Sequence, residues 1–371
     1  MLVGVPKEIK SQEYRVGLVP ASVKEIVKAG GSVLVEKNAG MGIKITDNEY
    51  IAAGAMIADT PDEIYESAEL IVKVKEPQPS ECRRLHAGQT LFTYLHLAPD
   101  PLQTRLLKES GVTAIAYETV TQHHGGLPLL TPMSEVAGRM SIQAGAHCLE
   151  AAQGGSGILL GGVPGVAPAH VVVIGGGVVG TNAIRVAIGM EARVTVIDKS
   201  LTRLRELDFQ FNSKLNTIYA TAHALEDCVM AADLVVGAVL VPGAAAPKLV
   251  TRAMIQSMRP GSVVVDVAID QGGCFETSRS TTHQEPTFVV DGVVHYCVAN
   301  MPGAVPRTST FALNNATLPF ILSIVTKGIK RALLSDIHFI NGLNVHQGKI
   351  TYEAIARELG YDYTPAVDAL H

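Results

Sequence analysis

The chain has 371 residues, of which 47% are hydrophobic and only 18% charged, and its formal net charge is −5. This length and apolar content predict two domains with substantial cores, in an α/β architecture with buried parallel strands. The negative balance, without a basic block, excludes a nucleic-acid-binding surface.

The cysteines and the start of the chain indicate a cytoplasmic protein. The five cysteines are odd in number and lack metal-ligand spacing, so a complete disulfide framework is excluded and reduced thiols are expected. The first residues begin a strand at once, without a signal-peptide layout. Residues 158–190 are almost free of charge, but glycines and prolines at turn positions break them up, so we expect no membrane span.

The N-terminal third alternates short apolar strands with helices, which predicts a parallel sheet. The expected strands are Leu2 to Val5, Ser32 to Val35, Leu70 to Val74, Thr90 to Leu95 and Thr113 to Tyr117. The expected helices are Ser22 to Lys28, Asp47 to Ala53, Asp62 to Ser67 and Pro101 to Lys108. No glycine fingerprint occurs here, so this is not the obvious cofactor domain.

A long helix is expected to bridge the two domains. Thr131 is predicted to cap it, Pro132 stands in its first turn, and apolar residues follow at helical spacing as far as Ala151. Ser134, near the start, has two interpretations: it contacts a cofactor phosphate, or it is an ordinary helix-end residue.

The next stretch has the pattern of a dinucleotide-binding unit. The apolar strand Val171 to Ile174 runs into Gly175-Gly176-Gly177-Val178-Val179-Gly180, which fits G-x-G-x-x-G. A helix-compatible run follows to about Gly189, and a second strand, Arg193 to Ile197, ends at Asp198. Strand, glycine turn, helix, strand and acid occur in the order that the fold requires.

Each residue of this pattern has a physical purpose. Gly175 allows the tight turn, Gly177 lets the backbone approach a pyrophosphate at the helix N-terminus, and Gly180 lets helix and strand pack closely. Asp198 is placed to accept hydrogen bonds from the ribose hydroxyls, and its charge repels a 2′-phosphate. Arg203 lies nearby, but one arginine beside an intact acid is weaker evidence, so NAD is favoured over NADP.

The remaining strands complete a doubly wound sheet whose carboxyl ends should face the nicotinamide. They are Thr217 to Ala220, Leu234 to Val236, Ser262 to Val267 and Val293 to Val298. A helical stretch from Ser309 to Leu334, broken by Pro319, and a helix from Tyr352 to Leu359 should return to the first domain. We therefore expect a discontinuous substrate domain, residues 1–129 and 309–371, and an NAD domain, residues 130–308, with the active site in the cleft between them.

Four charged or titratable residues stand near predicted strand ends, where a substrate site is expected. Lys75, which should share a strand face with Lys73, can bind a carboxylate or polarise a ketone, or is a solvated lysine. His96 suits proton transfer, or is structural. Arg15 suits bidentate carboxylate capture, or forms a surface salt bridge, and Asp270 can reach the cleft. Together they favour a 2-oxo or 2-amino acid substrate.

At this point the chain resembles the L-alanine dehydrogenase family over essentially its whole length. The matching segments are Met1 to Lys10 with Tyr14-Arg15-Val16, Val74-Lys75-Glu76-Pro77, Tyr94 to Ala98, Thr131 to Gly138, Gly161 to Val166, Gly237 to Gly243, Asp266 to Gly273 and Val298 to Pro302.

The resemblance implies NAD-dependent interconversion of L-alanine with pyruvate and ammonium. Arg15 and Lys75 would hold pyruvate by its carboxylate and carbonyl, His96 would be the acid/base, and Asp270 would position ammonia or water. The positions that match cofactor contacts are Ser134, Gly175, Gly177, Val178, Val179, Gly180, Asp198, Arg203, Ala220, Val239, Leu240, Ile269, Asp270, Arg279, Val298, Asn300 and Met301.

The resemblance also implies a homohexamer, and the chain departs from it at two places. One branch of the family binds a metal through an acid and a histidine where this chain has Ser323 and Lys327, so no metal is expected. Some relatives carry an adenine-binding serine at position 220, where Ala220 cannot make that bond.

Three other functions remain open. An NAD-binding component of a proton-translocating transhydrogenase would need no pyruvate pocket, and Arg15, Lys75 and His96 together argue against it. A reductase that joins an oxo acid to an amino acid would use a larger amine, and a non-catalytic NAD-binding regulator is the third possibility.

Overall fold

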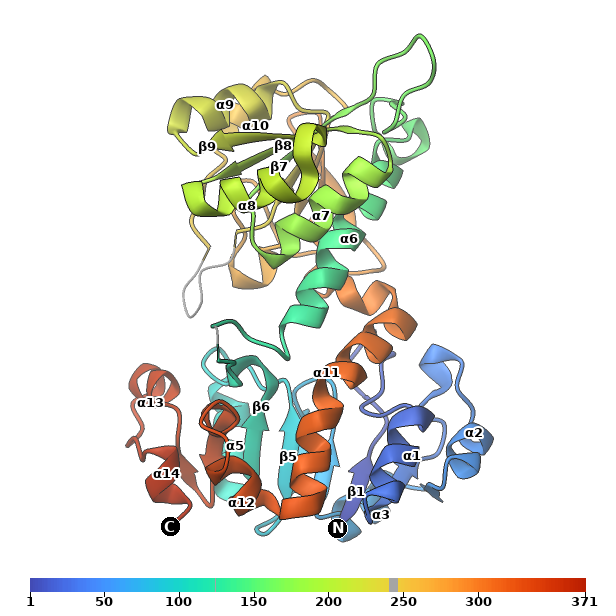
Figure 1. Ribbon diagram of the computed structural model, residues 1–371, viewed down its shortest axis with the longest axis vertical. Helices are drawn as coiled ribbons and strands as arrows, with labels where there is room; N and C mark the ends of the chain where they lie inside the picture. Colours follow the sequence, from blue (N-terminus) through green and yellow to red (C-terminus); the bar gives the residue numbers. More distant parts are fainter. Residues whose placement is uncertain (124, 240–245) are drawn as a thin grey trace. The chain divides into compact units, whose positions relative to one another are not determined.

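The computed structural model describes residues 1–123, 125–239 and 246–371, and it divides the chain into two compact units. Unit 1 comprises Met1–Met133 and Val305–His371, and unit 2 comprises Ser134–Ala304. Both chain termini belong to unit 1 (Figure 1). Helix α6 (Thr131–Cys148) contains the division at its first turn.

Unit 1 is built on an eight-stranded sheet in the order β15-β14-β6-β5-β4-β1-β2-β3. Its strands are β1 (Leu2–Val5), β2 (Ser32–Glu36), β3 (Met56–Ala58), β4 (Leu70–Val72), β5 (Thr90–Thr93), β6 (Thr113–Ala116), β14 (Leu343–His346) and β15 (Lys349–Ile350). Its helices are α1 (Pro20–Lys28), α2 (Asp47–Ala52), α3 (Pro61–Ser67), α4 (Pro79–Cys82), α5 (Pro101–Ser110), α11 (Pro306–Lys327), α12 (Ile329–Leu334), α13 (Glu353–Leu359) and α14 (Ala366–Ala369).

Unit 2 is built on a seven-stranded sheet in the order β12-β13-β11-β10-β7-β8-β9. Its strands are β7 (His170–Ile174), β8 (Arg193–Asp198), β9 (Leu215–Tyr219), β10 (Leu234–Gly237), β11 (Val263–Asp266), β12 (Thr287–Val290) and β13 (Val293–Tyr296). Besides α6, its helices are α7 (Val178–Gly189), α8 (Leu201–Phe211), α9 (Ala222–Met230) and α10 (Arg252–Ser257).

The two units repeat one topology. The strands β1 to β6, and likewise β7 to β11 with β13, follow the doubly wound order 3-2-1-4-5-6. The pairs among these strands are parallel, whereas β12, β14 and β15 join the sheets antiparallel. The predicted α/β class with two doubly wound units is therefore confirmed, with antiparallel strands added at the edges.

Alternation of side chains along the strands explains the two cores of unit 2. Val171, Val173 and Val236 face one side of the sheet and pack with residues of α6, α7 and α8. Val172 and Val235 face the other side and pack with residues of α9 and α10. Apolar side chains on both faces are what a parallel sheet buried between helices requires.

Several predictions of where helices and strands end are wrong. α11 runs without interruption through Pro319 and ends at Lys327, with Gly328 as its C-cap. Pro319 and Asn315 both lie on the exposed side of α11, so water can bond the Asn315 carbonyl that loses its helical partner. α6 begins at Thr131, whose hydroxyl donates to the Leu127 carbonyl at 3.0 Å, and the predicted cap by Thr131 stays a prediction. β4, β5 and β13 each end two residues earlier than expected, at Val72, Thr93 and Tyr296.

Two further expectations concern membrane-spanning helices and the redox state of the cysteines. Within the described residues, no helix is long and apolar enough to cross a membrane. All five cysteines lie in the described part of the chain, and each is buried and free of a disulfide.

Candidate active site

The glycine turn lies at the carboxyl edge of the unit 2 sheet, at the switch point between β7 and β10. Gly175 has φ +97°, and a Cβ there would lie 2.7 Å from the Ala238 carbonyl oxygen. A Cβ on Gly180 would lie 1.9 Å from the Gly175 carbonyl oxygen, so helix and turn touch directly. At Gly177 a Cβ would meet no atom within 4 Å. The open space there is what a pyrophosphate needs to approach the backbone and the N-terminus of α7.

Asp198 at the end of β8 and Arg203 in α8 both form hydrogen bonds to this turn. The Asp198 carboxylate accepts from the Gly176 amide at 2.7 Å and from the Ser200 amide at 2.8 Å. Arg203 Nε donates to the Gly176 carbonyl at 2.6 Å, and Nη2 donates to the Thr181 hydroxyl at 2.7 Å. The arginine therefore binds the turn itself, while Asp198 retains carboxylate lone pairs beside it for ribose hydroxyls.

Other predicted cofactor positions lie along the same edge. Val239 follows β10 and is packed close to Gly175, whereas Leu240 lies outside the described residues. The Ala220 amide, just after β9, donates to the Asp198 carbonyl at 3.0 Å. Ser134 lies one turn before Gly138, where a Cβ would be only 2.2 Å from the Val179 carbonyl oxygen. This close approach sets α6 beside the first turn of α7.

The remaining predicted cofactor contacts differ in exposure. Ile269, Val298 and Met301 are buried, and the side chains of Val298 and Met301 belong to a core cluster of unit 2. Asn300 is half-buried, and its carbonyl bonds the His283 ring at 2.9 Å. Arg279 is exposed, with its guanidinium 4.4 Å from the centre of the Phe288 ring.

Asp266, which the sequence did not single out, organises the loop that carries Asp270. It ends β11, is fully buried, and accepts from the amides of Ala268 at 3.2 Å and Cys274 at 3.0 Å and from the Ser278 hydroxyl at 2.6 Å. Asp270 is exposed on the short 3₁₀ turn Ile269–Gln271 of this loop. An acid at the end of an apolar strand was the available signal.

In unit 1, Arg15 lies in the segment after β1 and is almost fully buried. Its Nε and Nη2 bond the two oxygens of Glu13 at 2.7 and 2.6 Å, and Nη1 contacts the Met133 sulfur at 3.1 Å. Burial alone would raise the pKa of the Glu13 carboxyl, but the bonds from Arg15 outweigh it and lower that pKa. The sequence analysis missed Glu13, although a glutamate two residues before the arginine was visible.

Lys73 and Lys75 both follow the end of β4 at Val72, so the expectation that they share a strand face is wrong, and their environments differ. Lys73 is fully buried, and its ammonium bonds Glu8 at 3.1 Å and Glu81 at 2.7 Å. Lys75 is half-buried, and no hydrogen bond of its ammonium occurs within the described residues. Burial lowers the pKa of Lys75, against the attraction of Glu76, and the charge of Arg15 lowers it further.

His96 follows β5 in a left-handed conformation, φ +50°, which is uncommon for a residue other than glycine. Glu118, just after β6, holds it there: its carboxylate accepts from the His96 amide at 2.6 Å and from the Leu95 amide at 3.1 Å. The imidazole is 44% exposed, stacks 6.0 Å from the Tyr94 ring, and has Nδ1 3.9 Å from Glu118. The sequence analysis missed Glu118, an acid directly after a strand.

The carboxyl edge of the unit 1 sheet thus carries Arg15, Lys75 and His96, the three predicted substrate residues of that unit. The segments that hold them follow the neighbouring strands β1, β4 and β5. Asp270 belongs to unit 2, on the edge that carries the glycine turn. Each unit therefore carries its own, chemically distinct set of candidate residues at the carboxyl ends of its strands.

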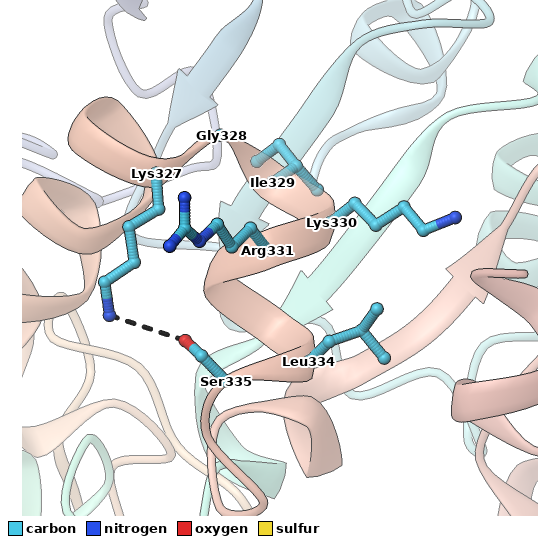
Figure 2. A pocket seen from close by; sticks show the side chains of 7 residues that line it. All are labelled: Lys327, Gly328, Ile329, Lys330, Arg331, Leu334 and Ser335. Carbon is cyan, nitrogen blue, oxygen red and sulfur yellow. Dashed lines mark hydrogen bonds between the residues drawn. The ribbon is translucent and has the colours of Figure 1, made fainter.

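A pocket at the turn between α11 and α12 contains none of these residues (Figure 2). It is lined by Lys327, Gly328, Ile329, Lys330, Arg331, Leu334 and Ser335. The nearby Val325 packs on Gly31, just before β2, so the pocket is at the amino edge of the sheet. Among the described residues, no group of three or more histidines, cysteines or acids is arranged to hold a metal.

The chain has two doubly wound units. One carries a dinucleotide turn, and the other carries Arg15, Lys75 and His96 beyond the carboxyl ends of its strands. These features define a two-domain dinucleotide-binding protein of the dehydrogenase type. The models of the alanine dehydrogenase/PNT N-terminal and C-terminal domains match residues 4–137 and 141–353. The chain belongs to the alanine dehydrogenase/PNT family.

Individual relatives agree with this assignment. The chain is 60% identical over 370 residues to the alanine dehydrogenase of Halomonas elongata, with all of both chains covered. A solved L-alanine dehydrogenase is 50% identical with a TM-score of 0.95, covering 97% of this chain and 99% of that one. The transhydrogenase of Sinorhizobium meliloti shares the fold, with a TM-score of 0.83 at 24% identity, covering 94% of this chain and 100% of that one.

Proposed function

We propose that this protein is an L-alanine dehydrogenase that interconverts L-alanine with pyruvate and ammonium, using NAD. The observation that carries the proposal is that Arg15, Lys75 and His96 follow the carboxyl ends of three neighbouring strands of unit 1. The same chain also has a complete dinucleotide turn in unit 2. A transhydrogenase component needs no such set, because it passes hydride between two nucleotides. Full-length identity of 60% to a named alanine dehydrogenase supports the same choice.

The residues of unit 2 fit NAD. The open space at Gly177 admits a pyrophosphate, and Asp198 beside the turn suits ribose hydroxyls while repelling a 2′-phosphate. When bound, NADH supplies hydride to the substrate carbon. Ser134, Asn300 and Arg279 are further residues that we assign to cofactor contact, and the buried Ile269, Val298 and Met301 would contribute through their backbone.

In the reductive direction, Arg15 and Lys75 bind pyruvate, and the Lys75 ammonium polarises its ketone. Ammonia attacks that carbon, His96 donates the proton that lets water leave, and the resulting iminium is reduced to L-alanine. Asp270 positions ammonia and assists proton movement. Preorganised cations and a placed proton donor lower the barrier because they need no rearrangement at the moment of reaction.

The test is a steady-state assay of NADH oxidation with pyruvate, with and without ammonium. We expect oxidation that requires both pyruvate and ammonium, and a strong preference for NADH over NADPH. Oxidation that proceeds with a second nucleotide and no ammonium would instead indicate a transhydrogenase component. Saturation by an amino acid in place of ammonium would indicate an oxo-acid reductase.

A further inference from the structure

Glu8 joins the segment that follows β1 to the segment that follows β4. Its Oε1 accepts from the Val74 amide at 2.7 Å and from the Lys75 amide at 3.4 Å. Its Oε2 accepts from the Lys73 ammonium at 3.1 Å. Because β1 and β4 are neighbours at the switch point of the sheet, this one carboxylate spans the place where a doubly wound sheet binds its ligand.

The ion pair between Lys73 and Glu8 is buried, and Lys73 and its partners make several further hydrogen bonds. Glu81 accepts from Lys73 at 2.7 Å and from the Tyr65 hydroxyl at 3.0 Å, and the Tyr117 hydroxyl donates to the Lys73 carbonyl at 3.0 Å. Burial alone would lower the pKa of Lys73, but the two carboxylates outweigh it and raise that pKa. Buried ion pairs add little net stability over apolar packing, so stability gives no reason for three charges here.

The backbone of Lys75 is fixed on both sides. Its amide donates to Glu8, and its carbonyl accepts from the Thr93 hydroxyl on β5 at 3.0 Å. The side chain of Lys75, by contrast, makes no hydrogen bond within the described residues. A fixed backbone with an available ammonium is the arrangement that a substrate-binding lysine requires.

We propose that Glu8 is a positioning residue, which fixes the backbone of Lys75 and thereby aims its ammonium at the oxo acid. Lys73 neutralises Glu8 and holds its carboxylate in the orientation that leaves Oε1 on the two amides. This inference rests on the proposed function for the identity of the oxo acid, but the placement of Lys75 can be measured without any substrate.

The experiment compares three variants of the full chain. Glu8→Ala removes the acceptor, Glu8→Gln keeps an oxygen that can accept from the two amides, and Glu81→Gln is the matched control. Glu81 also pairs with Lys73, but it does not contact Lys75. We expect Glu8→Ala to raise the KM for pyruvate about tenfold with the KM for NADH unchanged, Glu8→Gln to restore most of the loss, and Glu81→Gln to stay within about twofold of wild type.

A second readout is independent of turnover: the pH dependence with which an amine-acylating reagent labels Lys75, followed by mass spectrometry. We expect Glu8→Ala to shift the labelling midpoint of Lys75, and Glu81→Gln to leave it unchanged. Equal effects of Glu8→Ala and Glu81→Gln on labelling would overturn the proposal, because Glu8 would then serve stability alone. If the wild type shows no ammonium-dependent activity, the proposed function fails while the labelling still decides the role of Glu8.

Discussion

At the scale of single residues, pairing decides which charged side chains remain available to a substrate. Arg15 is held by Glu13, and Lys73 is held by Glu8 and Glu81. The ammonium of Lys75 has no such pair within the described residues. The Lys75 ammonium can therefore bind a carboxylate or polarise a ketone oxygen without first breaking a hydrogen bond to a described residue.

The first prediction concerns the protonation of Lys75. Burial lowers its pKa from the usual lysine value of about 10.4, so its positive charge is lost at a lower pH than that of an exposed lysine. A neutral amine cannot pair with a carboxylate, so the KM for pyruvate should rise with pH below that usual value. Lys75→Arg should abolish this alkaline rise, because arginine stays protonated. Steady-state assays between pH 7 and 10 measure it; an identical alkaline rise in Lys75→Arg would contradict the assignment.

The second prediction concerns His96 as the acid/base. Removing a proton-transfer group typically lowers the rate by about 10²–10⁴-fold, so His96→Ala should reduce turnover by that amount while the protein stays folded. His86→Ala is the control, since His86 is also exposed but precedes β5, at the opposite edge of the sheet. Turnover of His96→Ala close to that of His86→Ala, with a normal circular dichroism spectrum, would sink the assignment.

The sequence predicted residues at strand ends better than it predicted their partners. Arg15, Lys75 and His96 were found because each stands beside the carboxyl end of a short apolar strand. The sequence could not separate Lys73 from Lys75, because the difference arises from Glu8, which is 65 residues away in the chain. Long-range pairing of this kind leaves no local pattern. The catalytic and binding roles of these residues remain predictions.

At the scale of elements, two glycines of the same turn have different roles: Gly177 leaves open space, and Gly180 allows close packing. The third prediction compares them. Gly177→Ala adds a methyl group where no atom lies within 4 Å, so the protein should fold normally but bind NADH at least about tenfold more weakly. Gly180→Ala places a methyl group 1.9 Å from the Gly175 carbonyl oxygen, so it should destabilise unit 2 by about 1–3 kcal/mol or more. Thermal unfolding and NADH fluorescence titration measure the two effects.

Gly189, at the end of α7, is the matched control for this pair. A Cβ there also meets no atom within 4 Å, but the residue lies outside the turn. Gly189→Ala should leave both stability and NADH affinity close to wild type. If Gly177→Ala binds NADH as tightly as Gly189→Ala does, the turn is not the pyrophosphate site.

Element ends were harder to predict than element types, for physical reasons. The predicted strand to Val74 stops at Val72, and the Val74 amide donates to Glu8. The predicted break at Pro319 is absent because solvent can replace the missing helical bond. α11 ends instead at Lys327, before the cap residue Gly328, whose φ is +77°. β3, β12 and β15 were missed because short edge strands lack the long buried apolar runs that mark central strands. β14 was missed as well: it is buried, but it has only four residues, and Asn344 and His346 interrupt its apolar pattern.

At the scale of the whole molecule, the same topology serves two chemistries. In unit 2 the first strand of the fold leads into glycines that leave room for phosphate, and in unit 1 it leads into Pro6, Lys7 and Glu8. The sheet order alone therefore does not tell which unit binds the nucleotide. The residues at each switch point differ, and the glycine motif is the reason that we predict the cofactor in unit 2.

The last prediction uses the separation of the cores. Among the described residues, two core clusters contain only residues of unit 2 and one contains only residues of unit 1, so we expect the units to unfold in distinguishable transitions. A ligand at 100 times its Kd stabilises the state that binds it by about 2.7 kcal/mol. For a unit of roughly 170 residues this raises the unfolding temperature by about 5–11 °C.

Calorimetry of the whole protein with and without saturating NADH measures this shift. We expect NADH to raise the transition of unit 2 by that amount and to move the other transition less. NADPH at the same concentration is the control, because Asp198 should exclude its 2′-phosphate. A larger shift in the transition of unit 1 than in that of unit 2 would contradict the assignment of the cofactor to the glycine turn. Limited proteolysis during heating identifies which unit each transition belongs to, since a protease cleaves the unfolded unit first.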